Sequence, residues 1–241
     1  MKKLILTLLI SSLIITVSFA QKFWNSRFWN SGCPDKKNWS IVAYLGVNFL
    51  NAGKQIEDAM IEYGYNKSVR GYGFFSPTTY VKEHPYTDKI DGISWMVSVK
   101  RYIKFPFSIG LYTGKTYFAS THGYNGTTYL GIDHSVFSVS PIISFNSYDI
   151  FSIGLGPSIY FTNTWKEDRE EGECKHTKLG FMIDVGIRIP RKSLFFFAIN
   201  GQYRYVGKVE IGPFSVYKDT FPKTKVNYDH WLIGIGFGVR F

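Results

Sequence analysis

Two features are scarce in this chain of 241 residues, namely cysteine and long apolar runs. The two cysteines, Cys33 and Cys174, lie far apart and form no CxxC pair, so the sequence offers little for a thiolate metal site. After residue 20, no apolar run reaches the roughly 20 residues that a membrane-spanning helix needs. Any passage of the mature chain through a membrane would therefore use the strands of a barrel.

Sequence motifs of familiar enzymes are also missing. The chain has no Walker, Rossmann, HExxH or GxSxG motif. The acids between residues 166 and 175 lack the ordered spacing of a calcium loop. We therefore expect no cofactor and no metal site. The net charge of +10 is spread along the chain, so we attribute it to solvated loops and an anionic membrane surface rather than to nucleic acid.

The first 20 residues have the organisation of a secretion signal. Lys2 and Lys3 precede an apolar stretch over residues 4–17, and the Ser-Phe-Ala that ends at Ala20 places small residues at the cleavage positions. We predict a signal peptide over residues 1–20 that is removed after Ala20. An N-terminal membrane anchor is the alternative, and the shortness of the apolar stretch argues against it.

Residues 21–38 combine aromatic and basic side chains. The unit Phe-Trp-Asn-Ser occurs at 23–26 and again at 28–31, with Arg27 between the two copies. Aromatic rings beside cations suit the boundary between a membrane and water. We expect a periplasmic aromatic and basic segment here, which is an interfacial anchor, a partner-binding tail or a disordered stretch.

From residue 39 onward the apolar residues follow a period of two, which is the period of a β-strand. Between Trp231 and Phe241, every odd position holds a large apolar residue, while the even positions hold Leu232, three glycines and Arg240. The same alternation predicts about eight strands, at residues 39–49, 92–103, 106–118, 134–145, 149–161, 178–189, 194–206 and 231–241. One face of each strand is bulky and apolar, and the other carries glycine, serine and a few charges.

The size of the side chains indicates which face looks inward. A barrel of about eight strands has an interior just wide enough for side chains to fill it, which suits glycine and serine better than phenylalanine. The bulky residues then point to lipid. A soluble, lipocalin-like barrel would invert this arrangement and crowd the large side chains inside. The sequence therefore predicts an all-β fold, a transmembrane antiparallel up-and-down barrel over residues 39–241.

The connections between the predicted strands alternate in length. Short connections fall at 104–105, 146–149 and 190–193, whereas long ones cover 50–91, 120–132, 163–177 and 207–228. Outer-membrane barrels have short periplasmic turns and long extracellular loops. An even number of strands then places both ends of the barrel in the periplasm. Cys33 and Cys174 would lie on opposite sides of the membrane, so we expect them not to pair.

Two local features qualify this picture. In the first long loop, Ile56, Ala59, Met60 and Tyr63 share the helical spacing of one face, and Gly64 follows where a helix can end. We expect a short helix that packs on the loop and covers the lumen, with a lid or recognition element as the alternative.

Pro141 and Pro157 fall inside predicted strands, where each removes a backbone donor, so we expect bulges or local breaks there.

The last strand, Gly234-Ile-Gly236-Phe-Gly238-Val-Arg240-Phe241, resembles the closing strand of small Gram-negative outer-membrane β-barrels. The Gly154-Leu-Gly156-Pro157 stretch looks like a strand feature of the same family. The resemblance implies insertion into the bacterial outer membrane by the barrel assembly machinery. That machinery recognises alternating apolar residues that end in phenylalanine, which are Phe237, Val239 and Phe241 here. The resemblance supplies no function.

The inward faces carry a small group of charges. Asp184 is the clearest inward acid, and the inward cations are Lys100, Arg188, Arg204 and Arg240. Buried charges need partners. The excess of cations implies hydration, pairing with the carboxylate of Phe241, or a bound anion, and we favour a hydrated polar plug.

We expect an integral outer-membrane protein with a structural, adhesive or interaction role through its long extracellular loops. A filled lumen is incompatible with a general porin. The expected partners are outer-membrane lipid, lipopolysaccharide and the assembly machinery, and the protein is expected to be monomeric. One alternative is an enzyme at the extracellular rim that modifies acyl chains of lipid A or phospholipid, and another is a narrow channel for small apolar molecules.

His134, Ser135 and Asp133 are the one compact group for catalysis, but neighbours in a strand face opposite ways, so we assign no catalytic residue.

Overall fold

The computed structural model describes residues 39–50, 52–71, 79–82, 84–87, 92–104, 106–147, 150–166, 173–189, 193–216 and 219–241. The predicted signal peptide, the aromatic and basic segment over 21–38, and Cys33 lie outside the described residues. Eight strands form the barrel, namely β1 (Trp39–Leu50), β5 (Gly92–Lys104), β6 (Phe107–Phe118), β8 (Tyr129–Ser147), β9 (Phe151–Lys166), β10 (Glu173–Ile189), β11 (Phe195–Tyr205) and β16 (His230–Arg240). The other elements are α2 (Ala52–Glu62), β2 (Ser68–Gly71), β3 (Thr79–Lys82), β4 (Tyr86–Thr87), β7 (Thr121–Tyr124), β12 (Lys208–Ile211), β13 (Phe214–Val216), β14 (Asp219–Phe221) and β15 (Thr224–Asn227).

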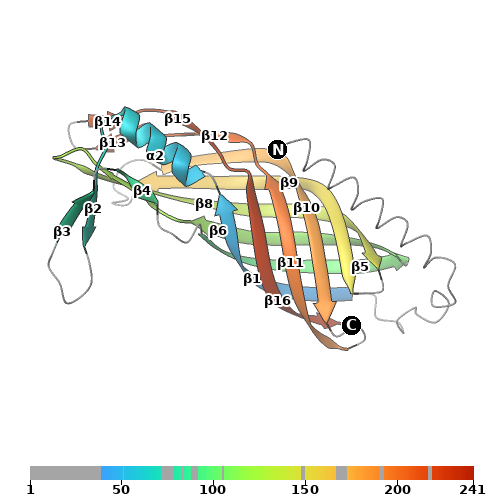
Figure 1. The fold of residues 1–241 in the computed structure, drawn as a ribbon. Helices are drawn as coiled ribbons and strands as arrows, with labels where there is room; N and C mark the ends of the chain where they lie inside the picture. The colour runs from blue at the N-terminus through green and yellow to red at the C-terminus, as the bar shows by residue number, and fades with distance from the viewer. Residues whose placement is uncertain are drawn as a thin grey trace, which may run out of the picture. The chain divides into compact units, whose positions relative to one another are not determined.

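The barrel closes because its first and last strands pair. Each of the eight strands pairs antiparallel with the next one along the chain, and β1 pairs with β16 from Ser40 opposite Arg240 to Leu50 opposite His230. Figure 1 shows β16, in dark red, beside β1, in blue. The predicted closed up-and-down barrel with a short helix after its first strand is confirmed.

The two faces of the wall differ as the alternation predicts. Leu179 and Ile235 on the outer face are 78% and 68% exposed, whereas Asp184 and Gln202 on the inner face are fully buried. Exposed apolar patches on soluble monomers rarely exceed about 300–600 Å², but here such residues cover the outside of all eight strands. This surface is suited to hydrocarbon, so the inverted, soluble arrangement is wrong.

Three strands are longer than the sequence predicts. β8 begins at Tyr129, β9 continues to Lys166, and β10 begins at Glu173, so the loop expected over 163–177 is largely strand. The extensions are paired, since Trp165 lies opposite Glu173. Their outward residues mix polar side chains such as Asn163 and Glu173 with aromatic ones such as Trp165, so regular apolar alternation is absent there although the backbone ladder continues.

Pro141 and Pro157 interrupt the ladder between β8 and β9 without a bulge. Val139 pairs with Ile159 and Ile143 with Leu155, so the register is the same on both sides of the gap. A local break was therefore the right expectation, and its cause is the missing proline donor. Gly156 keeps the strands close, because a Cβ at this position would lie 1.8 Å from the carbonyl oxygen of Pro141.

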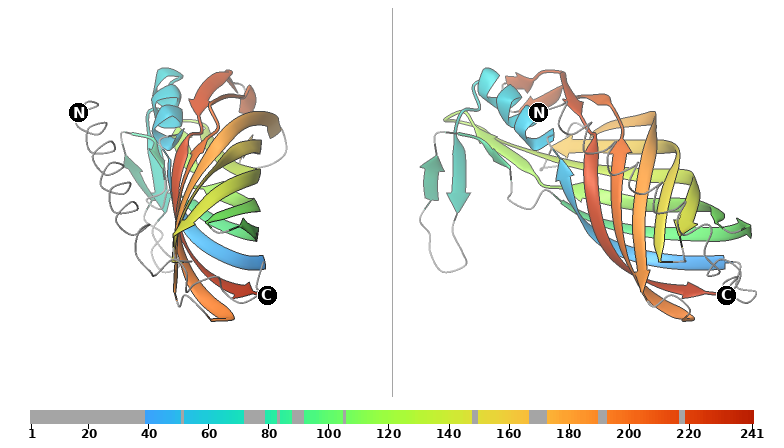
Figure 2. Two further views of the ribbon diagram at one scale, coloured as in Figure 1. Left: turned by 90° about the vertical axis from the view of Figure 1, so that its right-hand side faces the viewer. Right: turned by 45° about the vertical axis from the view of Figure 1, so that its right-hand side comes forward.

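The loops at one end of the barrel are folded. Helix α2 begins at Ala52, one turn before the predicted stripe, and Gly64 follows it with a φ of +84°, a conformation that glycine adopts without strain. The paired strands β12 and β15 lie beside α2, at the end of the barrel opposite the C-terminus (Figure 2). Among the described residues, no helix is long and apolar enough to cross a membrane.

Candidate functional site

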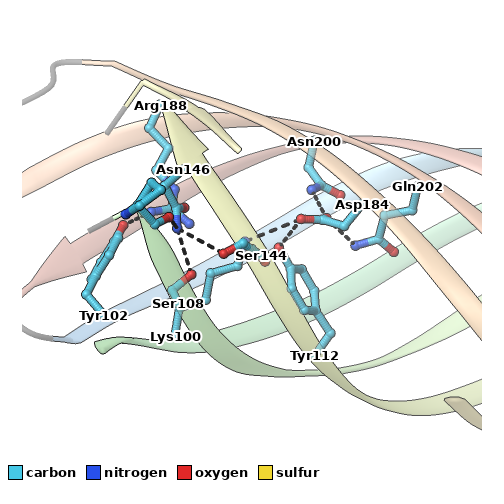
Figure 3. Close-up of polar contacts among 11 residues, drawn as sticks. Lys100, Tyr102, Ser108, Tyr112, Ser144, Asn146, Asp184, Arg188, Asn200 and Gln202 are labelled. Atoms are coloured by element: carbon cyan, nitrogen blue, oxygen red, sulfur yellow. Dashed lines mark hydrogen bonds and ion pairs between the residues drawn. The ribbon is translucent and has the colours of Figure 1, made fainter. Parts of the chain in front are cut away.

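The centre of the lumen is occupied by a polar cluster around Asp184. The carboxylate of Asp184 lies 3.3 Å from the Lys100 ammonium and accepts a 2.9 Å hydrogen bond from the Tyr112 hydroxyl. The side-chain amides of Asn200 and Gln202 donate to its other oxygen. Figure 3 shows these groups converging from different strands of the wall. Because each carboxylate oxygen has partners, the charge is neutralised and solvated by protein groups.

The polar contacts continue from Asp184 toward the end of the barrel that carries α2. The side-chain oxygen Oε1 of Gln202 accepts a 2.8 Å hydrogen bond from Arg204, and Arg204 also donates to the Thr116 hydroxyl at 3.3 Å. The hydroxyls of Thr116 and Ser94 are 2.7 Å apart, and Ser94 donates to Asn48 at 2.9 Å. We call the chain of contacts from Lys100 to Asn48 the lumen column.

Two further arginines fill the opposite, C-terminal end of the lumen. The guanidinium of Arg188 donates to the Tyr102 hydroxyl. Arg188 and Arg240 both lie over the ring of Phe196, with 5.7 Å and 4.7 Å from guanidinium carbon to ring centroid. Aromatic faces attract cations in this geometry. All five charges that the sequence places in the lumen are thus buried there, four cations against one acid.

Glycines on β16 make room for the rings in the lumen. A Cβ at Gly238 would lie 2.5 Å from the Phe196 ring, and one at Gly236 would lie 2.5 Å from the Tyr44 ring. The glycines at even positions of the last strand therefore leave space that neighbouring side chains occupy. They accept aromatic side chains from the two neighbouring strands.

Above the lumen column, the folded loops enclose an apolar cluster that we call the cap. Ile56 and Met60 of α2 are fully buried in it. The remaining contacts come chiefly from the chain between β11 and β16, through Val209, Ile211, Phe214, Val216, Phe221 and Val226. The sequence predicted Ile56, Ala59 and Met60 of the helix stripe correctly, whereas Tyr63 lies after α2 and is 47% exposed. It treated residues 207–228 only as a long loop. The short alternation of Val209 and Ile211 was the available indication of a strand there.

Tyr228 joins the cap to the barrel wall. Its hydroxyl lies 3.0 Å from the Thr164 hydroxyl and 3.2 Å from Nδ1 of His134. Nε2 of His134 lies 2.9 Å from the carbonyl oxygen of Ala119, so in the neutral ring Nε2 donates to that oxygen and Nδ1 accepts a hydrogen bond from the Tyr228 hydroxyl. Burial raises the pKa of the Tyr228 hydroxyl, which keeps it protonated as a donor.

The residues considered for catalysis do not come together. His134 points into the barrel toward Tyr228, whereas Ser135 lines a groove on the outer wall. Asp133 accepts a hydrogen bond from Ser120. Cys174 is a free thiol, 3.4 Å from the carbonyl oxygen of Gly212. Within the described ranges, no group of three or more histidine, cysteine or acidic side chains is placed to hold a metal ion.

Comparisons with known proteins identify the fold. No family model and no curated protein matches the sequence. The outer membrane protein OprG from Pseudomonas aeruginosa superposes with a TM-score of 0.51 at 13% identity, covering 85% of this chain and 96% of that chain. The fold is that of a small outer-membrane β-barrel. Neisserial surface protein A (NspA) gives a TM-score of 0.43 at 12% identity over 84% and 97% of the two chains, and Ail of Yersinia pestis gives 0.41 at 12% over 85% and 99%.

The closing strand of this outer-membrane barrel presents its apolar residues outward. Phe237 and Phe241 are 50% and 55% exposed, and the Phe237 ring stacks on Phe195 at 5.8 Å. Their use as an assembly signal, together with Val239, stays a prediction. The inward partners of this strand belong to the filled lumen.

Proposed function

We propose that the protein acts through its surfaces, as a sealed outer-membrane barrel that holds a folded extracellular cap for interaction with other molecules. The observation that carries this proposal is the row of buried, mutually bonded side chains inside the barrel, together with the apolar cluster at its mouth. The lumen column occupies the barrel, and the apolar cluster of α2 and residues 209–226 covers its mouth. A filled interior leaves the cap and the outer wall as the places where function resides.

The composition of the column argues against the transport of apolar molecules. A route for such molecules needs an apolar lining, but Asp184 and Arg204 are fully buried in the lumen. Asp184 is bonded to Lys100 across the lumen, and Arg204 is bonded to Thr116. Displacing them would leave charged groups without partners, at a cost of several kcal/mol each. Adhesion or another contact function through the cap requires no such rearrangement.

The outer wall offers a contact for lipopolysaccharide beneath the cap. A groove of about 480 Å³ lies where the apolar band ends, between Lys115 and Lys175. Phe137 and Phe161 lie across from one another between these lysines, with ring centroids 6.1 Å apart. Lysines beside a pair of aromatic rings match the phosphates and the acyl chains of a glycolipid. Lys175 is also paired with Glu173 at 2.7 Å, so a phosphate would compete with that carboxylate.

The sealed interior is tested by permeation. Vesicles that contain the purified protein should release a small apolar dye and a small anion no faster than vesicles without protein. Faster release, or turnover of phospholipid acyl esters by the wild-type protein, would contradict the proposal.

The lipopolysaccharide contact is tested by thermal unfolding in vesicles. Added lipopolysaccharide should raise the Tm of the wild-type protein, because a ligand that binds the folded state stabilises it. The increase should be smaller for Lys115→Gln combined with Lys175→Gln, and dephosphorylated lipopolysaccharide should act equally on both proteins. Lys225→Gln, an exposed lysine of the cap, is the control for charge. Equal increases for all variants would exclude this contact.

A further inference from the structure

The lipid-facing wall is hollowed near the end where the barrel has its short turns and its C-terminus. The groove has a volume of about 640 Å³ and crosses β5, β6, β8 and β9. One row of its lining residues runs across neighbouring strands as Trp39, Arg101, Ile109, Ile143 and Leu155. Sites for small ligands in proteins have volumes of this order, about 300–1,000 Å³.

The paired prolines explain why the wall is hollow here. Pro141 and Pro157 line the groove and lie at the break in the ladder between β8 and β9. Their short rings replace the long side chains that flank them on the same face, such as Ile143, which is 66% exposed. Gly156 holds the two strands together behind the rings, so the break produces a depression in the wall and leaves the lumen closed.

A single cation lies at one end of this otherwise apolar groove, within the described residues that line it. Arg101 is exposed and lies over the Trp39 ring at 5.4 Å. It is three residues from the end of β5 at Lys104. Three residues of a tilted strand correspond to about 8 Å of depth, which is close to the boundary between headgroups and hydrocarbon. An arginine at this depth reaches the headgroup layer with its guanidinium.

We propose that the groove binds one glycerophospholipid of the periplasmic leaflet, with its phosphate at Arg101 and an acyl chain along the apolar rows. The distribution of charge favours a lipid phosphate over a second copy of the chain. On the outward faces of the described barrel strands, the acids are Asp133 and Glu173, and both lie at the extracellular end. A parallel copy in the same membrane therefore brings no outward acidic side chain of these strands to Arg101, whereas every glycerophospholipid brings a phosphate.

Native mass spectrometry of the full-length protein in mild detergent tests this proposal. The probes are phosphatidylglycerol and a diacylglycerol with the same acyl chains. The wild-type protein should retain one phosphatidylglycerol and bind the diacylglycerol about tenfold more weakly, since the charged contact is lost. Arg101→Gln should weaken the binding of phosphatidylglycerol by a similar factor, and Arg101→Lys should weaken this binding less.

A second variant tests the groove itself. Ile143→Trp fills the groove from the lipid side and should abolish retention of phosphatidylglycerol. The matched control, Ile235→Trp, makes the same change on an outward residue of β16 that is 68% exposed and should retain the lipid. The proposal is overturned by equal binding of both probes, by unchanged binding in Arg101→Gln, or by a dimer that Ile143→Trp dissociates. The shift in electrophoretic mobility between the folded and unfolded barrel verifies that each variant folds.

Discussion

Two enclosed regions of this protein lie end to end, and they differ in chemistry, because the barrel interior holds many buried polar side chains besides its apolar ones and the cap is apolar. The lumen column consists of charged, amide and hydroxyl side chains, with Asp184 and Arg204 fully buried. The cap encloses apolar side chains such as Ile56 and Phe214, which are equally buried. On the other face of the cap helix, Ile61 is 44% exposed. The transition between the two falls at Tyr228 and His134.

The difference follows from the solvent outside each region. The barrel wall places its bulkiest apolar residues in lipid, so its interior can hold charged and amide side chains beside a small apolar cluster that includes Met96 and Phe196. The loops beyond the membrane are surrounded by water, so they bury apolar side chains as a soluble domain does. The chain therefore buries polar side chains inside the barrel and apolar side chains in the adjacent cap.

The largest effect should come from breaking the lumen column at its acid. Asp184→Ala leaves the Lys100 ammonium buried without its 3.3 Å partner and should lower the free energy of unfolding by about 3–5 kcal/mol. Denaturant unfolding in phospholipid vesicles measures this change. The combined variant Asp184→Leu and Lys100→Met removes both charges and should recover most of the loss. A double variant no more stable than Asp184→Ala would contradict a paired column.

Introducing a charge into the apolar cap should destabilise the cap and leave the barrel unaffected. Ile56→Asp places a carboxylate in an apolar cluster and should destabilise the closed cap by about 3 kcal/mol. We expect protease cleavage within residues 206–229 while the unfolding midpoint of the barrel stays unchanged. Ile61→Asp, on the exposed face of the same helix, is the matched control and should resist cleavage. Loss of the barrel in Ile56→Asp would mean that the two regions fold as one unit.

The next largest loss of stability should come from disturbing the close packing inside the barrel. Gly238→Val drives a side chain into the Phe196 ring and should cost about 1–3 kcal/mol. Gly201→Val is the control, because a Cβ there meets nothing closer than 4.0 Å. Vesicle unfolding of both variants gives the comparison, and equal stability would show that the lumen near β16 has free space.

The smallest effect is expected at the junction of the two regions. Tyr228→Phe removes the hydroxyl between Thr164 and His134 and should cost about 1 kcal/mol in the cap. Amide hydrogen exchange over residues 206–229 should become faster, with the barrel strands unaffected. Tyr63→Phe, in which the ring is 47% exposed, should change nothing. Faster exchange in the barrel strands would place Tyr228 in the barrel core instead.

Strand positions were predictable wherever one face meets lipid. The alternation from Trp231 to Phe241 located β16 to within one residue, and the stripe around Ile56 located the helix. The ends of β8, β9 and β10 were missed because their outward residues mix polar and aromatic side chains and Leu130 and Ile132 of β8 face inward, so no regular contrast between the faces remains.

The sequence by itself determined the period of two, the outward direction of the bulky residues and the charges of the lumen, because these follow from the side-chain alternation of a strand. Only the tertiary structure decided which partners the charges find, such as Lys100 with Asp184 from strands that are not neighbours in the wall. It also decided that the distant segments 52–62 and 208–227 fold together over the mouth. These contacts depend on the closure and register of the whole barrel, which no local pattern encodes.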